Sequence, residues 1–186
     1  EIDVNIGSIN LREIIENTFY DLLLENKIVE VFFATNINQR NEFWKIRELI
    51  PAANRKKGSI CSNDISVPIE KIPEFIKKLD NSIYLFSKEV LINCFGHIGD
   101  GNLHYNLFPR SENARIELEK NRKKLLNIIN ELVNKYSGSI SAEHGIGRSK
   151  IKELYKFEDP GKLYMMKLIK NVVDPKNILN PGSIFY

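Results

Sequence analysis

The chain has 186 residues and a formal net charge of +3; 42% of its residues are hydrophobic and 27% are charged. This composition is typical of a globular protein with a core, and a small charge spread along the chain favours a solvated surface over nucleic-acid binding. No apolar run approaches the roughly 20 residues that a membrane-spanning helix needs, and the first residues do not resemble a signal peptide.

The two cysteines, Cys61 and Cys94, do not have the spacing of a paired metal-binding motif. We expect both to be reduced core thiols in a reducing compartment, and therefore a cytoplasmic protein that is at most peripheral to a membrane. Because Glu1 is not a methionine, we also expect the chain to be a piece of a longer protein.

Before residue 60 the pattern predicts two strands and two helices. Alternating apolar residues indicate a strand over 1–6, and Ser8 or Asn10 can cap a helix that runs to about residue 26. We expect the apolar stripe of this helix to be core: Leu11, Ile14, Ile15, Thr18, Phe19 and Leu22. A second strand is predicted over 28–34 and a second helix over 38–50, which Pro51 ends. The residues 52–59 then form a mobile basic loop.

After residue 60 helices and strands continue to alternate. We predict a strand over 65–67, a helix after Pro68 that runs to about residue 79, hairpin arms over 91–95 and 103–108, and a helix over 112–136 that Gly138 ends. A strand over 139–142 and helices over 151–157 and 161–173 precede a turn-rich end. The tight hairpin argues for an antiparallel sheet, so we predict an α+β fold with helices packed on one face of the sheet and a helical C-terminal segment over 148–186.

The stretch 93–108 reads NCFGHIGDGNLHYNLF, and its Asp100-Gly101 pair predicts a hairpin. With these two residues as the turn, His97 pairs directly with His104, and their Cβ atoms lie about 5 Å apart. Asn106 looks out from the same face of the sheet. The turn therefore gathers potential ligands in one patch.

The third histidine, His144, follows Glu143 in a run of small residues over 141–147. Two neutral imidazoles and a carboxylate suit Zn²⁺, Fe²⁺ or Mn²⁺ and leave coordination positions free for a substrate. The alternative is structural, because a histidine in a strand is usually a satisfied polar residue and a Gly-Asp-Gly turn is usually only a turn. On the residues alone both interpretations stay open.

Four segments resemble the C-terminal half of the FAD-linked oxidases of the vanillyl-alcohol oxidase type. Residues 96–104 read GHIGDGNLH, 141–147 read SAEHGIG and 174–182 read DPKNILNPG; a weaker piece is WKIRE at 44–48 followed by DISVP at 64–68. Their order and spacing are similar to the branch that contains D-2-hydroxyglutarate dehydrogenase, D-lactate dehydrogenases and the glycolate oxidase flavin subunit. The resemblance covers nearly the whole chain.

The resemblance implies a ferredoxin-like cap domain that follows a separate FAD-binding domain. It implies that His97, His104 and Glu143 hold a divalent metal, with Zn²⁺ as the expected ion. The remaining roles that it implies are substrate contacts by Asn106 and His144, a grip on the substrate carboxylate by Arg47, and an approach to the flavin by His144, Asn180 and the segment 148–186. Ser62 departs from the pattern, because the 2-hydroxyglutarate enzymes carry a lysine there that could bind a second carboxylate.

The implied activity is oxidation of a D-2-hydroxy acid, of the lactate, glycolate or 2-hydroxyglutarate type, to the 2-oxo acid, with His144 as general base and a hydride passing to FAD. The partners implied are that acid and the FAD-binding domain; a homodimer is a possible further partnership. No Gly-rich phosphate-binding segment is visible, so the chain alone should hold FAD poorly and be inactive. Two alternatives stay open: a flavin-independent metalloenzyme and a non-catalytic binding or assembly subunit. By spacing alone, the favoured interpretation of Arg47 is a surface residue paired with a neighbouring acid.

Overall fold

The structure is a computed structural model that describes residues 10–185, and the chain divides into two compact units, Glu1–Ala52 and Ala53–Tyr186. The strand predicted over 1–6 lies outside the described residues. The first unit contains helix α1, Leu11–Leu24, and most of helix α2, Ile37–Lys57. Asn10 caps α1 by accepting a hydrogen bond from the backbone N–H of Glu13, as the sequence predicted.

Three expectations for the chain before residue 60 are wrong. Among the described residues, 28–34 form no strand, and none of the residues of α1 or α2 is buried, so the apolar stripe of α1 is only partly covered. Helix α2 also passes through Pro51 and includes most of the predicted basic loop. A proline inside a helix costs about 3 kcal/mol, but the Ala, Arg and Lys residues that follow are strong helix formers.

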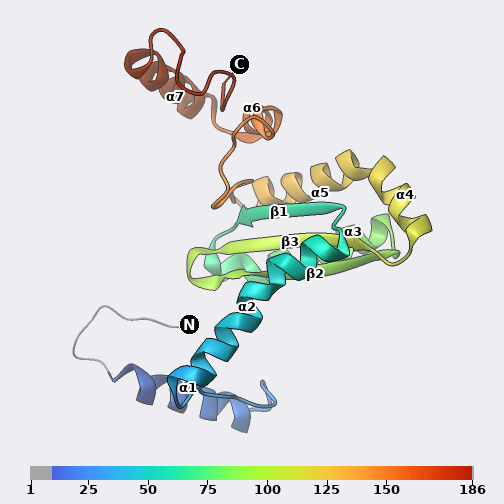
Figure 1. The fold of residues 1–186 in the computed structure, drawn as a ribbon, viewed down its shortest axis with the longest axis vertical. Helices are drawn as coiled ribbons and strands as arrows, with labels where there is room; N and C mark the ends of the chain where they lie inside the picture. The colour runs from blue at the N-terminus through green and yellow to red at the C-terminus, as the bar shows by residue number, and fades with distance from the viewer. Residues whose placement is uncertain (1–9, 186) are drawn as a thin grey trace. The chain divides into compact units, whose positions relative to one another are not determined.

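The second unit is built on a three-stranded antiparallel sheet (Figure 1). Its strands are β1, Cys61–Ser66, β2, Val90–His97, and β3, Asn102–Pro109, in the order β1-β3-β2. The 3₁₀ turn η1, Ile69–Lys71, and helix α3, Ile72–Phe86, connect β1 to β2. After β3 come α4, Glu112–Lys120, and α5, Arg122–Lys135. The single helix predicted over 112–136 is therefore interrupted, at Asn121, whose side chain donates to the carbonyl of Glu117.

One face of the sheet packs against α3 and α5 and forms the core, so the predicted α+β fold with helices on one face is confirmed (Figure 1). The core side chains are Cys61 and Ile65 of β1, Leu103, Tyr105 and Leu107 of β3, Phe75, Leu79 and Ile83 of α3, and Leu125, Ile129 and Val133 of α5. Burial of each large apolar side chain contributes about 1.5–3 kcal/mol. The opposite face of the sheet is largely polar.

The second unit has the strand and helix order of a ferredoxin-like fold whose fourth strand is reduced to one bridge. In that fold the last strand lies beside β1. Here Ser139 forms a single antiparallel bridge with Ser66 of β1, and the strand predicted over 139–142 goes no further. The chain beyond the bridge is instead held by the side chain of Asp64 on β1.

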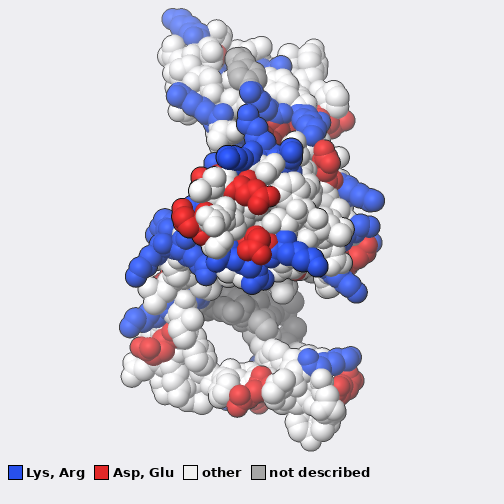
Figure 2. Space-filling view, turned by 90° about the vertical axis from the view of Figure 1, so that its right-hand side faces the viewer, with Lys and Arg blue, Asp and Glu red and all other residues white. Residues whose placement is uncertain are grey.

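The predicted C-terminal helices are confirmed as α6, Ile151–Phe157, and α7, Pro160–Val173. Asp174 then holds the following turn, because its carboxylate accepts the backbone N–H groups of Ile178 and Leu179 and pairs with Lys170. Within 10–185, no helix has the length and apolar character to cross a membrane. Figure 2 shows basic and acidic side chains interspersed over the face of the sheet-containing unit that it displays, which fits a solvated surface.

Candidate metal and substrate site

The hairpin forms, but the predicted register is wrong. His97 pairs with Asn102, and His104 pairs with Phe95. The turn is longer than two residues because Ile98–Asp100 form a 3₁₀ turn, and of Asp100 and Gly101 only Gly101 has the positive φ that a type I′ turn requires at both central positions. Relative to the prediction, the partner of His104 moves by two residues, and an even shift leaves every side chain on its face of the sheet.

His97 and His104 are therefore diagonal neighbours on the polar face, with ring centroids 6.0 Å apart. Glu143 arrives between them from the loop after α5. Its Oε1 lies 2.7 Å from Nδ1 of His97, and its Oε2 lies 3.9 Å from Nε2 of His104. The structure thus brings together the three residues predicted to hold a metal. Each imidazole faces one oxygen of the same carboxylate.

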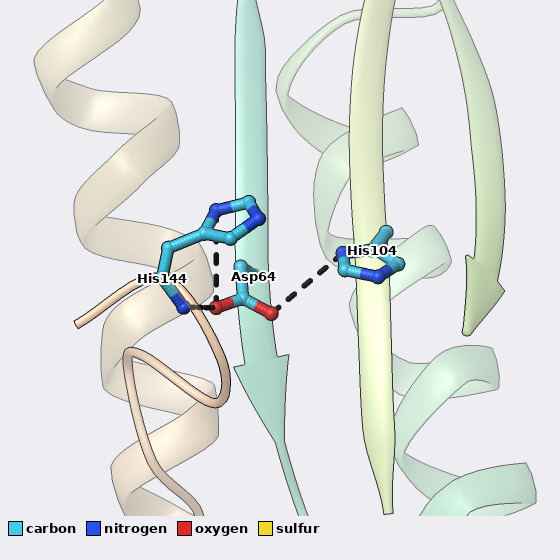
Figure 3. A group of neighbouring side chains, drawn as sticks. All are labelled: Asp64, His104 and His144. Carbon is cyan, nitrogen blue, oxygen red and sulfur yellow. Dashed lines mark hydrogen bonds and ion pairs between the residues drawn. The ribbon is translucent and has the colours of Figure 1, made fainter. Parts of the chain in front are cut away.

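Asp64 of β1 is the residue of this cluster that sequence reasoning did not single out. It lies directly opposite His104 in the register, and its side chain is only 1% exposed. Figure 3 shows it between His104 and His144, with one carboxylate oxygen toward each. Oδ1 is 3.6 Å from Nδ1 of His104 and accepts a 2.8 Å hydrogen bond from the amide of Asn102.

The other oxygen of Asp64 binds the loop that carries Glu143. Its Oδ2 accepts the backbone N–H groups of three successive residues, Ala142, Glu143 and His144, at 3.1, 2.8 and 2.8 Å. Burial raises the pKa of Asp64, but the N–H groups of His144 and Glu143 and the Asn102 amide lower it by more, so the pKa lies below the ordinary value. Asp64 is therefore a buried carboxylate that stays ionised.

His104 is favoured in its neutral form. Burial and the neighbouring imidazoles of His144 and His97 together lower its pKa by more than the carboxylates of Asp64 and Glu143 raise it. Neutral imidazole is the form that binds a metal ion, so the environment of His104 prepares it as a ligand.

Among the described residues, the ligand atoms that lie within 4.8 Å of one another, close enough to share a metal ion, belong to Asp64, His104 and His144 and not to the predicted set of His97, His104 and Glu143. The two groupings share His104. However, Asp64 already accepts hydrogen bonds from four N–H groups, so coordination through its oxygens would disrupt these bonds. The assignment of His97, His104 and Glu143 as the ligand set stays a prediction.

The other predicted site residues lie in different environments. The ring of His144 stacks on that of His104, with centroids 5.9 Å apart, and its side chain is 67% exposed. Asn106 is buried on the same sheet face, and its amide donates to the carbonyl of His104 at 3.2 Å. Asn180 is exposed in the turn after α7 and has a left-handed φ of 48°. Arg47 lies on α2 in the first unit, so its role in substrate binding stays a prediction.

A sequence signal for Asp64 did exist. Aspartate is depleted in strands, and a strand carboxylate that becomes buried requires donors from elsewhere in the chain. Asp64 stands in CSNDIS, with buried neighbours Asn63 and Ile65. Its three loop donors are 78 to 80 residues away, so only the fold identifies them.

Comparisons with known proteins all point to one family. A family model described as FAD linked oxidases, C-terminal domain, matches residues 7–184. D-2-hydroxyglutarate dehydrogenase of Stutzerimonas stutzeri is 35% identical over 90% of this chain, and the mitochondrial D-2-hydroxyglutarate dehydrogenase of Arabidopsis thaliana is 35% identical over 94%. D-lactate dehydrogenase of Anaerostipes hadrus is 32% identical over 95%. The chain spans 36%, 30% and 36% of the lengths of these three relatives.

Proposed function

Since the chain belongs to the FAD-linked oxidases, as their C-terminal domain, we propose that it binds a divalent metal ion and a D-2-hydroxy acid and presents the acid to the flavin of the same protein. The observation that carries this proposal is the Glu143 carboxylate lying between His97 and His104. The activity would be oxidation of the acid to the 2-oxo acid, in line with the names of the relatives.

The donor set fits a metal ion by its chemistry. Two imidazoles and one carboxylate are ligands that Zn²⁺, Fe²⁺ and Mn²⁺ accept, and three protein ligands leave positions open for a substrate. Side chains of His97 and Glu143 are 45% and 44% exposed, so the ligands are accessible from solvent. His104, at 14% exposed, anchors the set against the sheet.

A bound metal ion would supply Lewis acidity toward the hydroxyl and carboxylate oxygens of the substrate, and FAD would supply the hydride acceptor. The chain's own residues would do the rest. His144, exposed beside His104, would take the proton of the C2 hydroxyl as general base. Arg47 would bind the substrate carboxylate through its guanidinium fork. Asn106, fixed by its hydrogen bond to the backbone, would contact the acid.

The open side of the cluster supports a role for a second domain. Because the side chain of His144 is exposed, a substrate bound beside it would be open to water. Hydride transfer also requires that the flavin lie against the substrate. We propose that the flavin-binding domain of the same protein covers this side, with Asn180 and the segment 148–186 near the flavin. The chain alone is then expected to retain metal without turning over the acid.

The substrate class is proposed to be a monocarboxylic 2-hydroxy acid. Ser62 lies on β1 opposite Asn106, on the same face as Asp64, and its hydroxyl contacts that of Ser59 at 2.7 Å. It stands where the resemblance to the 2-hydroxyglutarate enzymes puts a lysine. Without that cation the second carboxylate of a dicarboxylic acid would have no partner at this position.

The direct test uses His104→Ala in the chain joined to its flavin-binding domain. We expect loss of the bound metal and of turnover, with flavin retained, because His104 is the least exposed of the three proposed ligands. Asn130→Ala, which truncates a buried polar side chain on α5, is the control and should keep both metal and turnover. Normal turnover by His104→Ala would exclude the metal role. Turnover by the chain with metal but without flavin would instead favour a flavin-independent metalloenzyme.

A further inference from the structure

We propose that Asp64 is a positioning residue that aligns the metal ligands from two distant segments. One oxygen of its carboxylate holds the segment Ala142, Glu143 and His144, and the other orients the ring of His104. The part that concerns the metal ion rests on the proposed function. The part that concerns the loop stands on the geometry alone.

Asp64 accepts four of the hydrogen bonds that hold the loop beside the sheet. Past the Ser66–Ser139 bridge no ladder continues, and three successive N–H groups converge on Oδ2 of Asp64. The backbone carbonyl of Asp64 also accepts the N–H of Ala142, at 3.3 Å. An ionised carboxylate that accepts several backbone N–H groups forms strong, charge-assisted hydrogen bonds. Because Glu143 lies within this segment, the same bonds determine where its carboxylate stands.

Asp64 and Glu143 face different nitrogens of the His104 ring. Oδ1 lies 3.6 Å from Nδ1, while Nε2 lies on the side of Glu143. A carboxylate beside Nδ1 favours the tautomer that carries the proton there, which leaves the lone pair of Nε2 directed toward the Glu143 carboxylate. The ring is thereby prepared to bind an ion next to Glu143.

The amide of Asn102 keeps the Asp64 carboxylate in this orientation. It donates to Oδ1 of Asp64 at 2.8 Å and to the carbonyl of Ile65 at 3.3 Å, while its own Oδ1 is buried without a partner. A buried carbonyl oxygen without a partner costs free energy. Asn102 nevertheless donates to Asp64, and with the three loop N–H groups it occupies Asp64 as an acceptor rather than leaving it as a ligand.

The test is Asp64→Asn, compared with Asp80→Asn. Asparagine keeps one oxygen for the loop N–H groups but turns an NH₂ group toward the Asn102 amide and Nδ1 of His104, which favours the tautomer with a proton on Nε2. Asp80 is a matched control because it is a half-buried aspartate that accepts one hydrogen bond, from the Tyr105 hydroxyl, away from the cluster. Zn²⁺ is the probe, and its dissociation constant is measured by competition with a chromophoric chelator in the full-length protein that carries this chain.

We expect Asp64→Asn to weaken Zn²⁺ binding by about 10–100-fold, the usual effect of losing a residue that orients a ligand, and Asp80→Asn to leave it unchanged. Nitrogen NMR of the metal-free protein should show the His104 proton moving from Nδ1 to Nε2 in Asp64→Asn. Amide hydrogen exchange should accelerate at 142–144 and not across β2 and β3. These readouts separate a positioning role from a general loss of stability.

Wild-type Zn²⁺ affinity in a folded Asp64→Asn variant would overturn this inference and leave the proposed function intact. Failure of the wild-type protein to bind Zn²⁺ would overturn the proposed function and the part of this inference that concerns the metal ion. Unchanged hydrogen exchange at 142–144 in Asp64→Asn would overturn the part that concerns the loop. If Asp64→Asn does not fold, Asn102→Ala decides, because it removes the donor that orients Oδ1. Weaker Zn²⁺ binding by that variant supports the inference, and unchanged binding overturns it.

Discussion

Oε1 of Glu143 lies 2.7 Å from Nδ1 of His97, although the two residues are 46 positions apart in the chain. The contact joins the end of β2 to the loop after α5, and it places a carboxylate beside the histidine hairpin. The candidate site therefore depends on two independent placements, the hairpin register and the position of the loop.

Glu143→Gln should test the carboxylate as a metal ligand. An amide cannot supply the negative charge, so we expect Zn²⁺ affinity to fall by at least about 100-fold, more than for a residue that only orients a ligand. Glu131→Gln is the control, because Glu131 is an exposed glutamate paired with Lys156 on α6. Equal affinities of the two variants, measured by chelator competition, would contradict the ligand role.

Ser62→Lys should alter substrate preference. A lysine on β1 opposite Asn106 would add a cation on the polar face of the sheet, where it can pair with a second carboxylate. We expect kcat/KM for 2-hydroxyglutarate to rise relative to that for lactate, by about tenfold if the ion pair contributes about 1.4 kcal/mol in the transition state. Steady-state kinetics of the flavoenzyme with both acids measure the ratio. Ser62→Ala is the control and should leave the ratio unchanged.

Gly101→Ala should destabilise the second unit. Gly101 has a φ of +68°, and a Cβ there would lie 2.1 Å from the carbonyl oxygen of Val67. The left-handed conformation alone costs an L-residue about 1–2 kcal/mol, and the backbone clash adds to this cost. Gly99→Ala in the same turn should change stability much less, because a Cβ there meets nothing within 4 Å. Urea unfolding of both variants makes the comparison, and equal midpoints would show that Gly101 is not constrained.

The lowered pKa of Asp64 should make the free energy of unfolding depend on pH in the acid range. Its folded-state pKa lies below the ordinary value, so the native state binds this proton more weakly than the unfolded state does. The stability that Asp64 contributes is therefore present above about pH 4 and is lost as the pH falls through the folded-state pKa. The difference in free energy of unfolding between wild type and Asp64→Asn should shrink between pH 5 and pH 2.5. A difference that stays constant over this range would show that the pKa of Asp64 is not lowered.

In the hairpin, local sequence predicted which face each side chain lies on but not the register of the strands. Alternation along the strands placed His97, His104 and Asn106 on one face, and this held because an even change of register preserves the face. The register itself depended on the number of turn residues, and Ile98–Asp100 added a 3₁₀ turn that the Asp-Gly pair alone did not reveal. Pro51 is a second example, since the helix continued through a residue that usually ends one.

The chemical groups of the site, their common face on the hairpin and the α+β class follow from the sequence by itself, because strand periodicity and turn residues act over a few positions. Only the tertiary structure decided that Glu143 stands between the two histidines and that Asp64 holds it there. Those contacts join residues 46 and 79 positions apart. A hydrogen bond across such a separation depends on how the sheet and α5 pack, and no local pattern encodes it.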